Sequence, residues 1–210
     1  MKYYTTKLVS PSETERIKEW AKSADVAYNL GVIRSCEVVL FHDIEDNRVH
    51  ILISDSENEV CMSQDIMNFL SSGTSMLVLT HNHNGTETCF SNRDIEALLD
   101  YTRINYMIVI NSNKEVYVLG KSQHTESRDK VMELFWRWWS DSEKYALSLR
   151  HEATKILAFS PVAMHADQQE YENLLRIEDG IMAALHNMAH RTQFLNFAEN
   201  AGFYGACLIS

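Results

Sequence analysis

The sequence feature that most constrains the fold is a continuous apolar run, residues 76–80 (MLVLT), that leads straight into a polar segment. A run that is apolar at every position, rather than at every second one, predicts a strand that is buried on both faces of a sheet. The polar segment covers residues 81–90, and apolar residues recur at helical spacing after Ser91. A strand, a loop and a helix in succession are typical of α/β folds, so we expect a sheet that is covered by helices.

The same alternation extends through the first 120 residues. Two apolar runs, residues 36–42 and 48–54, are separated by a turn-like segment and predict a hairpin. Residues 106–110 and 115–119 predict a second pair of strands. We therefore predict an α/β domain, residues 1–121, in which a mixed sheet is flanked by helices.

Residues 122–210 follow a different pattern. Residues 126–159 contain neither Gly nor Pro and repeat apolar residues at helical spacing, and a second helical stretch covers residues 167–190. We predict that residues 122–210 form a C-terminal helical extension. This extension would gate a functional site of the α/β domain, bind substrate or form a homodimer. Its dense aromatic group is explained by packing between helices, with a docking surface for a protein partner as the alternative. This group consists of Phe135, Trp136, Trp138 and Trp139.

The charge balance excludes several classes of protein. The 210 residues include 19 Lys and Arg against 29 Asp and Glu, which gives a formal net charge of −10 at pH 7. A chain with this balance lacks the basic footprint that binds nucleic-acid phosphates, so we do not expect a nucleic-acid partner. No apolar run approaches the roughly 20 residues that cross a bilayer, so we expect no membrane segment.

The cysteines and the N-terminal residues bear on the compartment. Cys36, Cys61, Cys89 and Cys207 lie far apart and form no CxxC pair. The first 20 residues contain no apolar segment of the kind found in secretory signals. We therefore expect a cytoplasmic protein with free thiols.

The segment that follows the buried strand carries the candidate chemistry. His81 and His83 are two positions apart at the end of a strand, so their side chains point to the same face. Asp94 falls in the first turn of the helix that follows the loop, and the loop is long enough to fold back toward the histidines. Two His and one carboxylate leave one open position in a tetrahedral Zn²⁺ site, which is typical of catalytic zinc.

A simpler interpretation of the same residues is structural. Ser91 is a suitable N-cap for the helix, and Asp94 three residues later suits the helix dipole. The pair HxH alone is common in polar loops. The full pattern of HxH, seven residues and SxxD between a buried strand and a helix is more specific, and the capping and metal-binding interpretations are compatible.

This pattern resembles the JAMM motif of the JAB/MPN metalloprotease superfamily. The similarity is greatest to the RadC-like branch, which usually has HNHP where this chain has HNH followed by Asn84. The resemblance covers about residues 37–119 and implies a JAB/MPN-like (cytidine-deaminase-like) fold. It implies one Zn²⁺ per chain, held by His81, His83 and Asp94.

The resemblance also implies roles for two further residues. Glu37, at the start of the first predicted strand, corresponds to the family glutamate that takes a proton from the attacking water and passes it to the leaving amine. Ser91 corresponds to the serine that donates a hydrogen bond to the oxyanion. The family cleaves peptide or isopeptide bonds, often at conjugates of ubiquitin-like proteins, which implies a protein or peptide substrate.

Alternatives remain at several points. Other glutamates that precede or lie in the motif loop are Glu45, Glu57, Glu59 and Glu87. A second metal at His186 and His190, and a nucleophilic Cys36 or Cys89, are weaker hypotheses. The whole chain is alternatively an interaction scaffold without activity of its own, or a RadC-like protein associated with nucleic acid, which the net charge disfavours.

Overall fold

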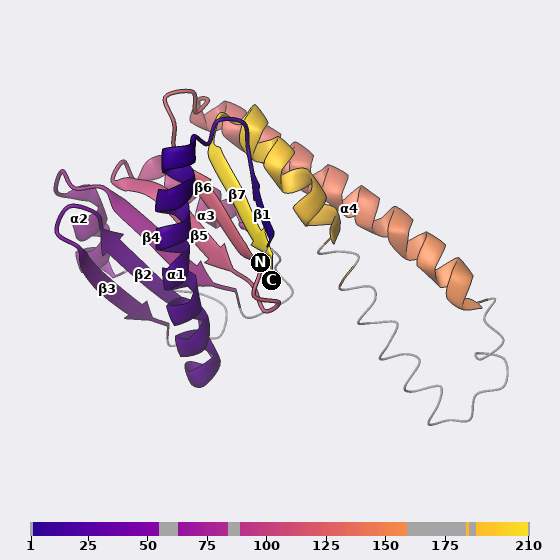
Figure 1. Cartoon of the computed structure of the whole chain (residues 1–210), viewed down its shortest axis with the longest axis horizontal. Coiled ribbons are helices and arrows are strands. Elements are labelled where there is room, and N and C mark those ends of the chain that lie inside the picture. The colour runs from indigo at the N-terminus through magenta and orange to yellow at the C-terminus, as the bar shows by residue number, and fades with distance from the viewer. Residues whose placement is uncertain (1, 55–62, 84–88, 159–183, 185–187, 210) are drawn as a thin grey trace. The chain divides into compact units, whose positions relative to one another are not determined.

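The computed structural model describes residues 2–54, 63–83, 89–158, 184 and 188–209. Its core is one mixed sheet with helices on both faces (Figure 1). The seven strands are, in spatial order, β1 (Lys2–Thr5), β7 (Tyr204–Ile209), β6 (Val116–Gly120), β5 (Ile104–Ile110), β4 (Leu77–Asn82), β2 (Val38–Asp43) and β3 (Arg48–Ile53). Only the central pair, β4 and β5, is parallel; the other neighbours are antiparallel. This confirms the predicted α/β architecture of a mixed sheet flanked by helices.

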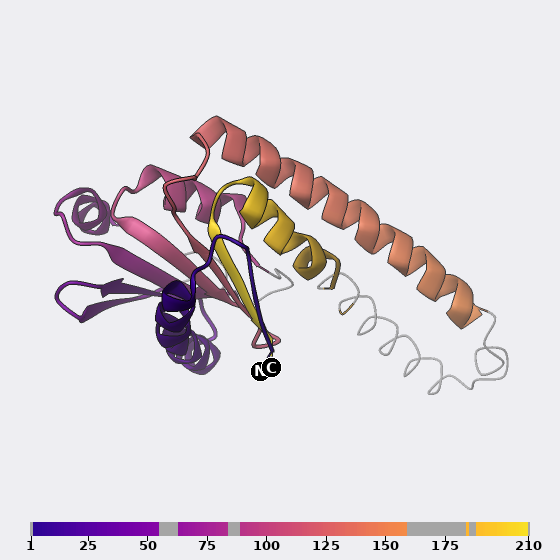
Figure 2. The ribbon, with the colours of Figure 1, turned by 45° about the horizontal axis from the view of Figure 1, so that its top comes forward.

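Helix α1 (Pro11–Arg34) covers one face of the sheet (Figure 2). It begins where Ser10 accepts a hydrogen bond from the backbone N–H of Glu13, and Pro11 occupies the first helical position. Its buried residues include Ile17 and Ala24, which pack in a cluster with Val78 of β4. Small residues on α1 let the helix lie close to the sheet.

The opposite face carries α2 (Gln64–Ser71), α3 (Asn92–Asp100), the first turns of α4 (Arg128–Ala158) and the helical residues 195–200 (Figure 2). Phe69 of α2 packs edge-on against Phe41, with 6.3 Å between ring centroids. Phe135 and Phe197 pack in the same way at 6.0 Å. The sheet is therefore buried on both faces at its centre, as the apolar run in β4 predicts.

The chain divides into two compact units. One contains residues 1–135 and 195–210, and the other contains residues 136–194. In the second unit the ring of Trp139 packs against His190 at 4.9 Å between centroids, and Trp138 packs edge-on against His190 and Phe194. These contacts support the packing interpretation of the aromatic group, although Trp136 is half exposed.

The prediction of a helical extension over residues 122–210 is wrong at its end. Helix α4 and the helical residues 188–200 are as expected, but residues 204–209 form β7, which lies between β1 and β6. Gly205 and the small, buried Ala206 suit a central strand because the helical residues before it pack closely: a Cβ on Gly205 would lie 2.6 Å from the Cβ of Ala198.

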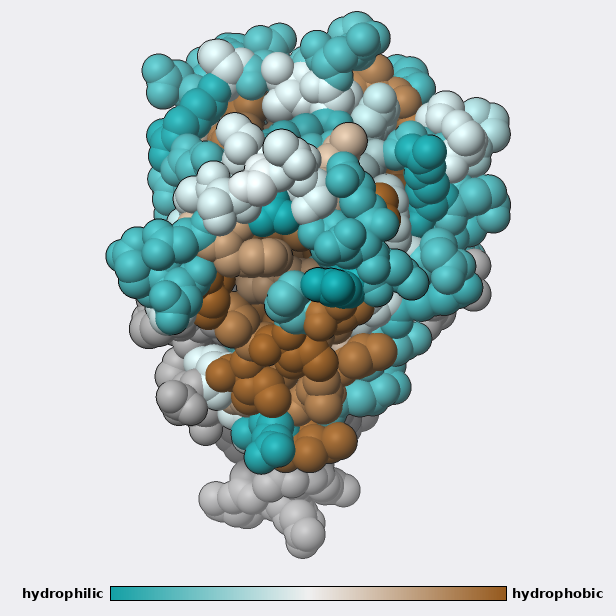
Figure 3. All heavy atoms as spheres, turned by 90° about the vertical axis from the view of Figure 1, so that its left-hand side faces the viewer, coloured by the Kyte–Doolittle hydropathy of each residue, from teal (hydrophilic) through white to brown (hydrophobic). Residues whose placement is uncertain are grey.

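Strand β3 forms one outer edge of the sheet. Three of its side chains, Val49, Ile51 and Ile53, are about half exposed, and Figure 3 shows an apolar area on this side of the molecule. Outer strands of this kind are usually protected by charge or by a covering segment. In the part of the chain that the structure describes, no helix is long and apolar enough to span a membrane.

Candidate metal centre

The end of β4 places the two histidines. Thr80 and Asn82 point toward α1, where the Thr80 hydroxyl lies 2.8 Å from that of Ser23, so His81 points to the opposite face. His83 lies one residue beyond the strand, yet its backbone N–H still donates to the carbonyl of Ile110 on β5 at 2.9 Å. The extended register therefore continues through His83, and both imidazoles lie on the same side, as the sequence predicts.

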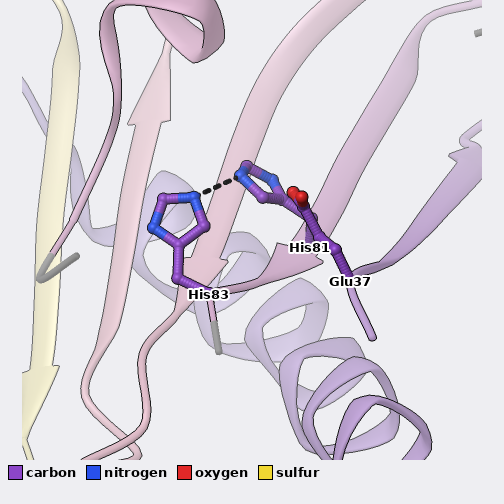
Figure 4. Close-up of side chains that lie close together, drawn as sticks. All are labelled: Glu37, His81 and His83. Atoms are coloured by element: carbon purple, nitrogen blue, oxygen red, sulfur yellow. Dashed lines mark hydrogen bonds between the residues drawn. The ribbon is translucent and has the colours of Figure 1, made fainter. Parts of the chain in front are cut away.

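The two imidazoles face each other (Figure 4). Their Nε2 atoms are 3.1 Å apart, and their ring planes are inclined by 61°. Both side chains are buried. Two ring nitrogens at this distance need either a shared proton or a cation between them, because two lone pairs at close range repel each other.

Asp94 completes the group from α3. Its Oδ1 lies 3.0 Å from Nε2 of His81, and its Oδ2 lies 3.5 Å from Nε2 of His83. Burial raises the pKa of Asp94, but the charge and hydrogen bond of His81, followed by those of His83, outweigh burial and hold the pKa well below its ordinary value. The carboxylate is thus an anion facing two imidazoles.

The N-terminus of α3 fixes the orientation of Asp94. Ser91 is the N-cap: its hydroxyl accepts from the backbone N–H of Asp94 at 3.3 Å. The carboxylate in turn accepts from the backbone N–H of Ser91 at 2.7 Å and from its hydroxyl at 2.8 Å, both at Oδ2. The N-cap at Ser91 is as predicted, and Ser91 and Asp94 together form a capping box that holds the carboxylate beside the histidines.

Glu37 lies on the other side of His81. It immediately precedes β2, and its carboxylate and the ring nitrogens of His81 and His83 lie within 4.8 Å of one another (Figure 4). Val39 pairs with His81 across the sheet, so Glu37 emerges beside the end of β4 on the same face as His81. Glu37, His81 and His83 can together hold one metal ion.

Asn82, between the two histidines, holds the backbone on both sides of Glu37. Its side-chain oxygen accepts from the backbone N–H of Val38 at 2.8 Å, and its side-chain nitrogen donates to the carbonyl of Cys36 at 3.3 Å. This is the pattern that a neighbouring strand would supply. On the other edge, the carbonyl of Glu37 accepts from the backbone N–H of Ser54 at 3.0 Å. The backbone of Glu37 is therefore fixed from both sides.

Gly31 of α1 provides the space for Asn82. A Cβ on Gly31 would lie 2.3 Å from Nδ2 of Asn82, which is too close for any side chain other than hydrogen. Sequence reasoning missed both residues. The available signal was strand alternation: a residue between two histidines of one face must point to the other face, and Asn on a core-facing position requires hydrogen-bond partners.

The donor set fits a tetrahedral cation. Zinc binds His nitrogen at about 2.0–2.1 Å, so neighbouring ligand atoms around tetrahedral zinc are about 3.3 Å apart. Nε2 of His81 lies 3.1 Å from Nε2 of His83 and 3.0 Å from Oδ1 of Asp94, while the other carboxylate oxygen, Oδ2, lies 3.5 Å from Nε2 of His83. Imidazole nitrogen and carboxylate oxygen are ligands that zinc accepts. Oδ2 of Asp94 is already held by the helix cap, and Oδ1 faces Nε2 of His81.

The other predicted residues have surroundings of their own. Glu45 lies in the hairpin after β2, at the far end of that strand from Glu37, and its backbone N–H donates to Asp43. Cys36 and Cys89 are buried free thiols, an environment in which thiols are unreactive. His190 is buried and contacts Glu143 at 3.1 Å. Glu57, Glu59, Glu87, Cys61 and His186 lie outside the described residues.

No protein-family model matches this sequence, and no curated protein matches it. The interpretation of the site therefore depends on the geometry above and on the motif.

Proposed function

We propose that this protein is a zinc-dependent hydrolase of the JAB/MPN (JAMM) type that cleaves a peptide or isopeptide bond. His81, His83 and Asp94 would hold the ion. A single observation carries the proposal: Nε2 of His81 lies 3.1 Å from Nε2 of His83 and 3.0 Å from Oδ1 of Asp94, with the carboxylate of Glu37 beside the two histidines. The spacing HxH-x7-SxxD, which resembles the JAMM motif, supplies the reaction type.

Zinc in such a site lowers the pKa of water toward neutrality and polarises a carbonyl. Glu37 would accept a proton from the attacking water and pass it to the leaving amine. A fixed backbone keeps the carboxylate in position for both transfers. The hydrogen bonds from Asn82 and Ser54 keep its main chain in place.

Ser91 would donate to the oxyanion of the tetrahedral intermediate. Its hydroxyl now donates to Oδ2 of Asp94, which also accepts from the backbone N–H of Ser91. The hydroxyl can therefore turn toward substrate while Oδ2 keeps one partner. An oxyanion donor of this kind is worth about 2.7–4 kcal/mol in the transition state.

The substrate class is also part of the proposal. We expect a protein or peptide, with conjugates of ubiquitin-like proteins as the first group to test. The net charge of −10 disfavours the RadC-like nucleic-acid alternative. A scaffold role without activity is a separate hypothesis that the experiments below address, whereas a homodimer through the C-terminal helices is tested by the molar mass of the protein in solution.

The first experiment is metal analysis of purified protein, with about one zinc per chain expected. His81→Ala, His83→Ala and Asp94→Ala should each remove the zinc. Glu37→Gln should keep it and abolish cleavage of a panel of ubiquitin-like conjugates and unmodified peptides. Glu45→Gln, which changes a glutamate at the other end of β2, is the matched control.

The outcomes separate the hypotheses. A folded protein that takes up no zinc would contradict the hydrolase proposal. Zinc uptake without cleavage of any panel member would favour the scaffold. Full activity of Glu37→Gln would remove Glu37 from the role of proton acceptor.

A further inference from the structure

A second candidate site lies at the other end of the sheet. A cavity of about 700 Å³ lies near the N-terminal half of α1, where β4 and β5 begin and β6 ends. His81 is five positions further along the chain than Met76, which lines the cavity, and this corresponds to about 16 Å along the strand. The cavity is on the α1 face, whereas His81 points to the opposite face, so the two sites are independent.

Aromatic rings form one wall of this cavity. Trp20, Tyr106 and Tyr204 line it. The ring of Tyr106 lies 4.6 Å from that of Trp20 and is nearly parallel to that of Tyr204, at 6.4 Å between centroids. Ile44 and Met76 add apolar surface. Flat rings next to apolar side chains suit a planar ligand, because offset stacking contributes in addition to burial.

Gly120 allows the aromatic wall to form. A Cβ at this position would lie 2.2 Å from the ring of Tyr106, so Gly120 provides the space that the ring occupies. The hydroxyl of Tyr106 donates to the carboxylate of Glu13 on α1, which fixes the ring from its other end. The wall is thus preorganised, which lowers the entropy cost of binding.

The charges around the cavity are opposite in sign to that of the whole chain. Two cations, Arg16 and Lys121, and one anion, Glu13, line it, a local balance of +1 against −10 overall. Glu13 already accepts the Tyr106 hydroxyl. Lys121 uses one of its three N–H groups to donate to the carbonyl of Tyr101 at 2.9 Å, so two can serve a ligand.

Burial lowers the pKa of Lys121 to about 8, an effect that the nearby Asp100 only partly opposes. The ammonium is charged at pH 7, but it has lost part of its water shell. An anion beside it would replace that solvation, and charged hydrogen bonds in such surroundings are strong.

We propose that this cavity binds a small planar aromatic anion, with its ring against the wall formed by Trp20, Tyr106 and Tyr204 and its acidic group near Lys121 and Arg16. A carboxylate, a phosphate or a sulfonate on a one- or two-ring system meets this description. The site is separate from the metal centre and does not depend on the proposed hydrolase activity.

The experiment is a calorimetric titration of the full chain at pH 7 with 2-naphthoate, and with 2-naphthamide as its neutral isostere. We expect a dissociation constant of about 1 mM or lower for 2-naphthoate, as ordinary ligand efficiencies give for its size. The amide should bind at least about tenfold more weakly.

Variants then test the residues. Lys121→Met should remove the preference for the anion, while Lys114→Met, which removes a lysine near Tyr28 at the other end of the sheet, should leave it unchanged. Trp20→Leu should weaken both ligands about threefold to tenfold. Arg16→Gln, on the exposed surface of α1, provides a second test of the anion contact if Lys121→Met proves unfolded by circular dichroism.

Three results would overturn the proposal: no binding of 2-naphthoate at several millimolar, equal affinities for acid and amide, or equal effects of Lys121→Met and Lys114→Met. Each of these results is independent of zinc content and cleavage activity.

Discussion

The sheet carries a buried polar cluster at each end, and the two clusters differ in what they need. At the end away from the histidines, Arg103 donates to the carbonyls of Phe69, Ser72 and Ser75 and lies 3.4 Å from the carboxylate of Asp43. The N–H donors of the Arg103 guanidinium are matched by carbonyl and carboxylate acceptors, and its positive charge faces the negative charge of Asp43. This cluster is complete within the protein.

At the candidate metal centre the balance of donors and acceptors is reversed. Ring nitrogens and carboxylate oxygens converge, and these groups are acceptors when the imidazoles are neutral at the facing nitrogens. Such a cluster is completed by protons or by a metal ion. Burial and polarity alone therefore do not mark a functional site, whereas the balance of donors and acceptors does.

The largest effect on stability is expected at the cluster around Arg103. Arg103→Met should lower the free energy of unfolding by about 3–5 kcal/mol, because Asp43 stays buried without its cation. Urea denaturation measures this change. Arg128→Met, which removes an exposed arginine that contacts Asp100, is the control and should cost much less, because exposed ion pairs contribute little to stability. Equal losses for the two variants would mean that the Arg103 cluster is not a stabilising network.

At the candidate metal centre, the free energy of unfolding should instead depend on zinc. Added zinc at a free concentration of 100 times its dissociation constant should raise the free energy of unfolding by about 2.7 kcal/mol, because the ion binds only the folded chain. A chelator should reverse the gain, and His83→Ala should abolish it. Stabilisation of His83→Ala equal to that of the unaltered protein would place zinc somewhere else.

A smaller effect is expected at Asn82. Asn82→Ala removes the partners of a buried N–H and a buried carbonyl beside Glu37, which should cost about 1–3 kcal/mol of stability. Zinc content should persist, while cleavage should fall about 10–100-fold, as with other groups that orient a metal site. Gly31→Ala should act in the same direction because its Cβ displaces the Asn82 side chain.

The control for this pair is Asn68→Ala, which alters an exposed asparagine of α2. Unchanged activity in Asn82→Ala with zinc still bound would show that Glu37 keeps its position without the side chain.

The smallest effect is the change in stability with pH that Asp43 causes. The hydroxyl of Ser75, first, and then backbone N–H groups and Arg103 lower the pKa of Asp43, against the effect of burial. A lowered pKa in the folded state stabilises above the unfolded value of about 3.9, and the contribution disappears as pH falls through the folded pKa. The stability difference between the unaltered protein and Asp43→Asn should therefore be constant near neutrality and narrow below about pH 4. A difference that narrows above pH 5 would contradict this assignment.

Local patterns were sufficient for much of the site. The apolar run before His81 predicts β4, alternation predicts a common face for His81 and His83, and the SxxD pattern predicts the cap at Ser91. These signals act over a few residues, so they can be recognised without the rest of the fold. The position of Glu37 came from the resemblance, since its approach to His81 depends on pairing between strands about 40 residues apart.

Other features have no local signal. Strand β1 pairs with β7, for example Lys2 with Ile209, and neither segment contains a local sequence signal that identifies its partner. The tail after residue 200 follows a long helical region, and its short apolar run is compatible with either a helix end or a strand. The hydrogen bonds of Asn82 depend on two segments that meet only in the folded sheet.

The place of β7 has a consequence for the order of events during synthesis. Strand β6 ends at Gly120 and β7 begins at Tyr204, so translation of more than 80 residues separates two neighbours in one sheet. Of the described strands, β1 is made before the others and pairs only with β7, which is made after them. A nascent chain can pair the five strands from β6 to the outer strand β3 while β1 stays without its partner until residues 204–209 have been made.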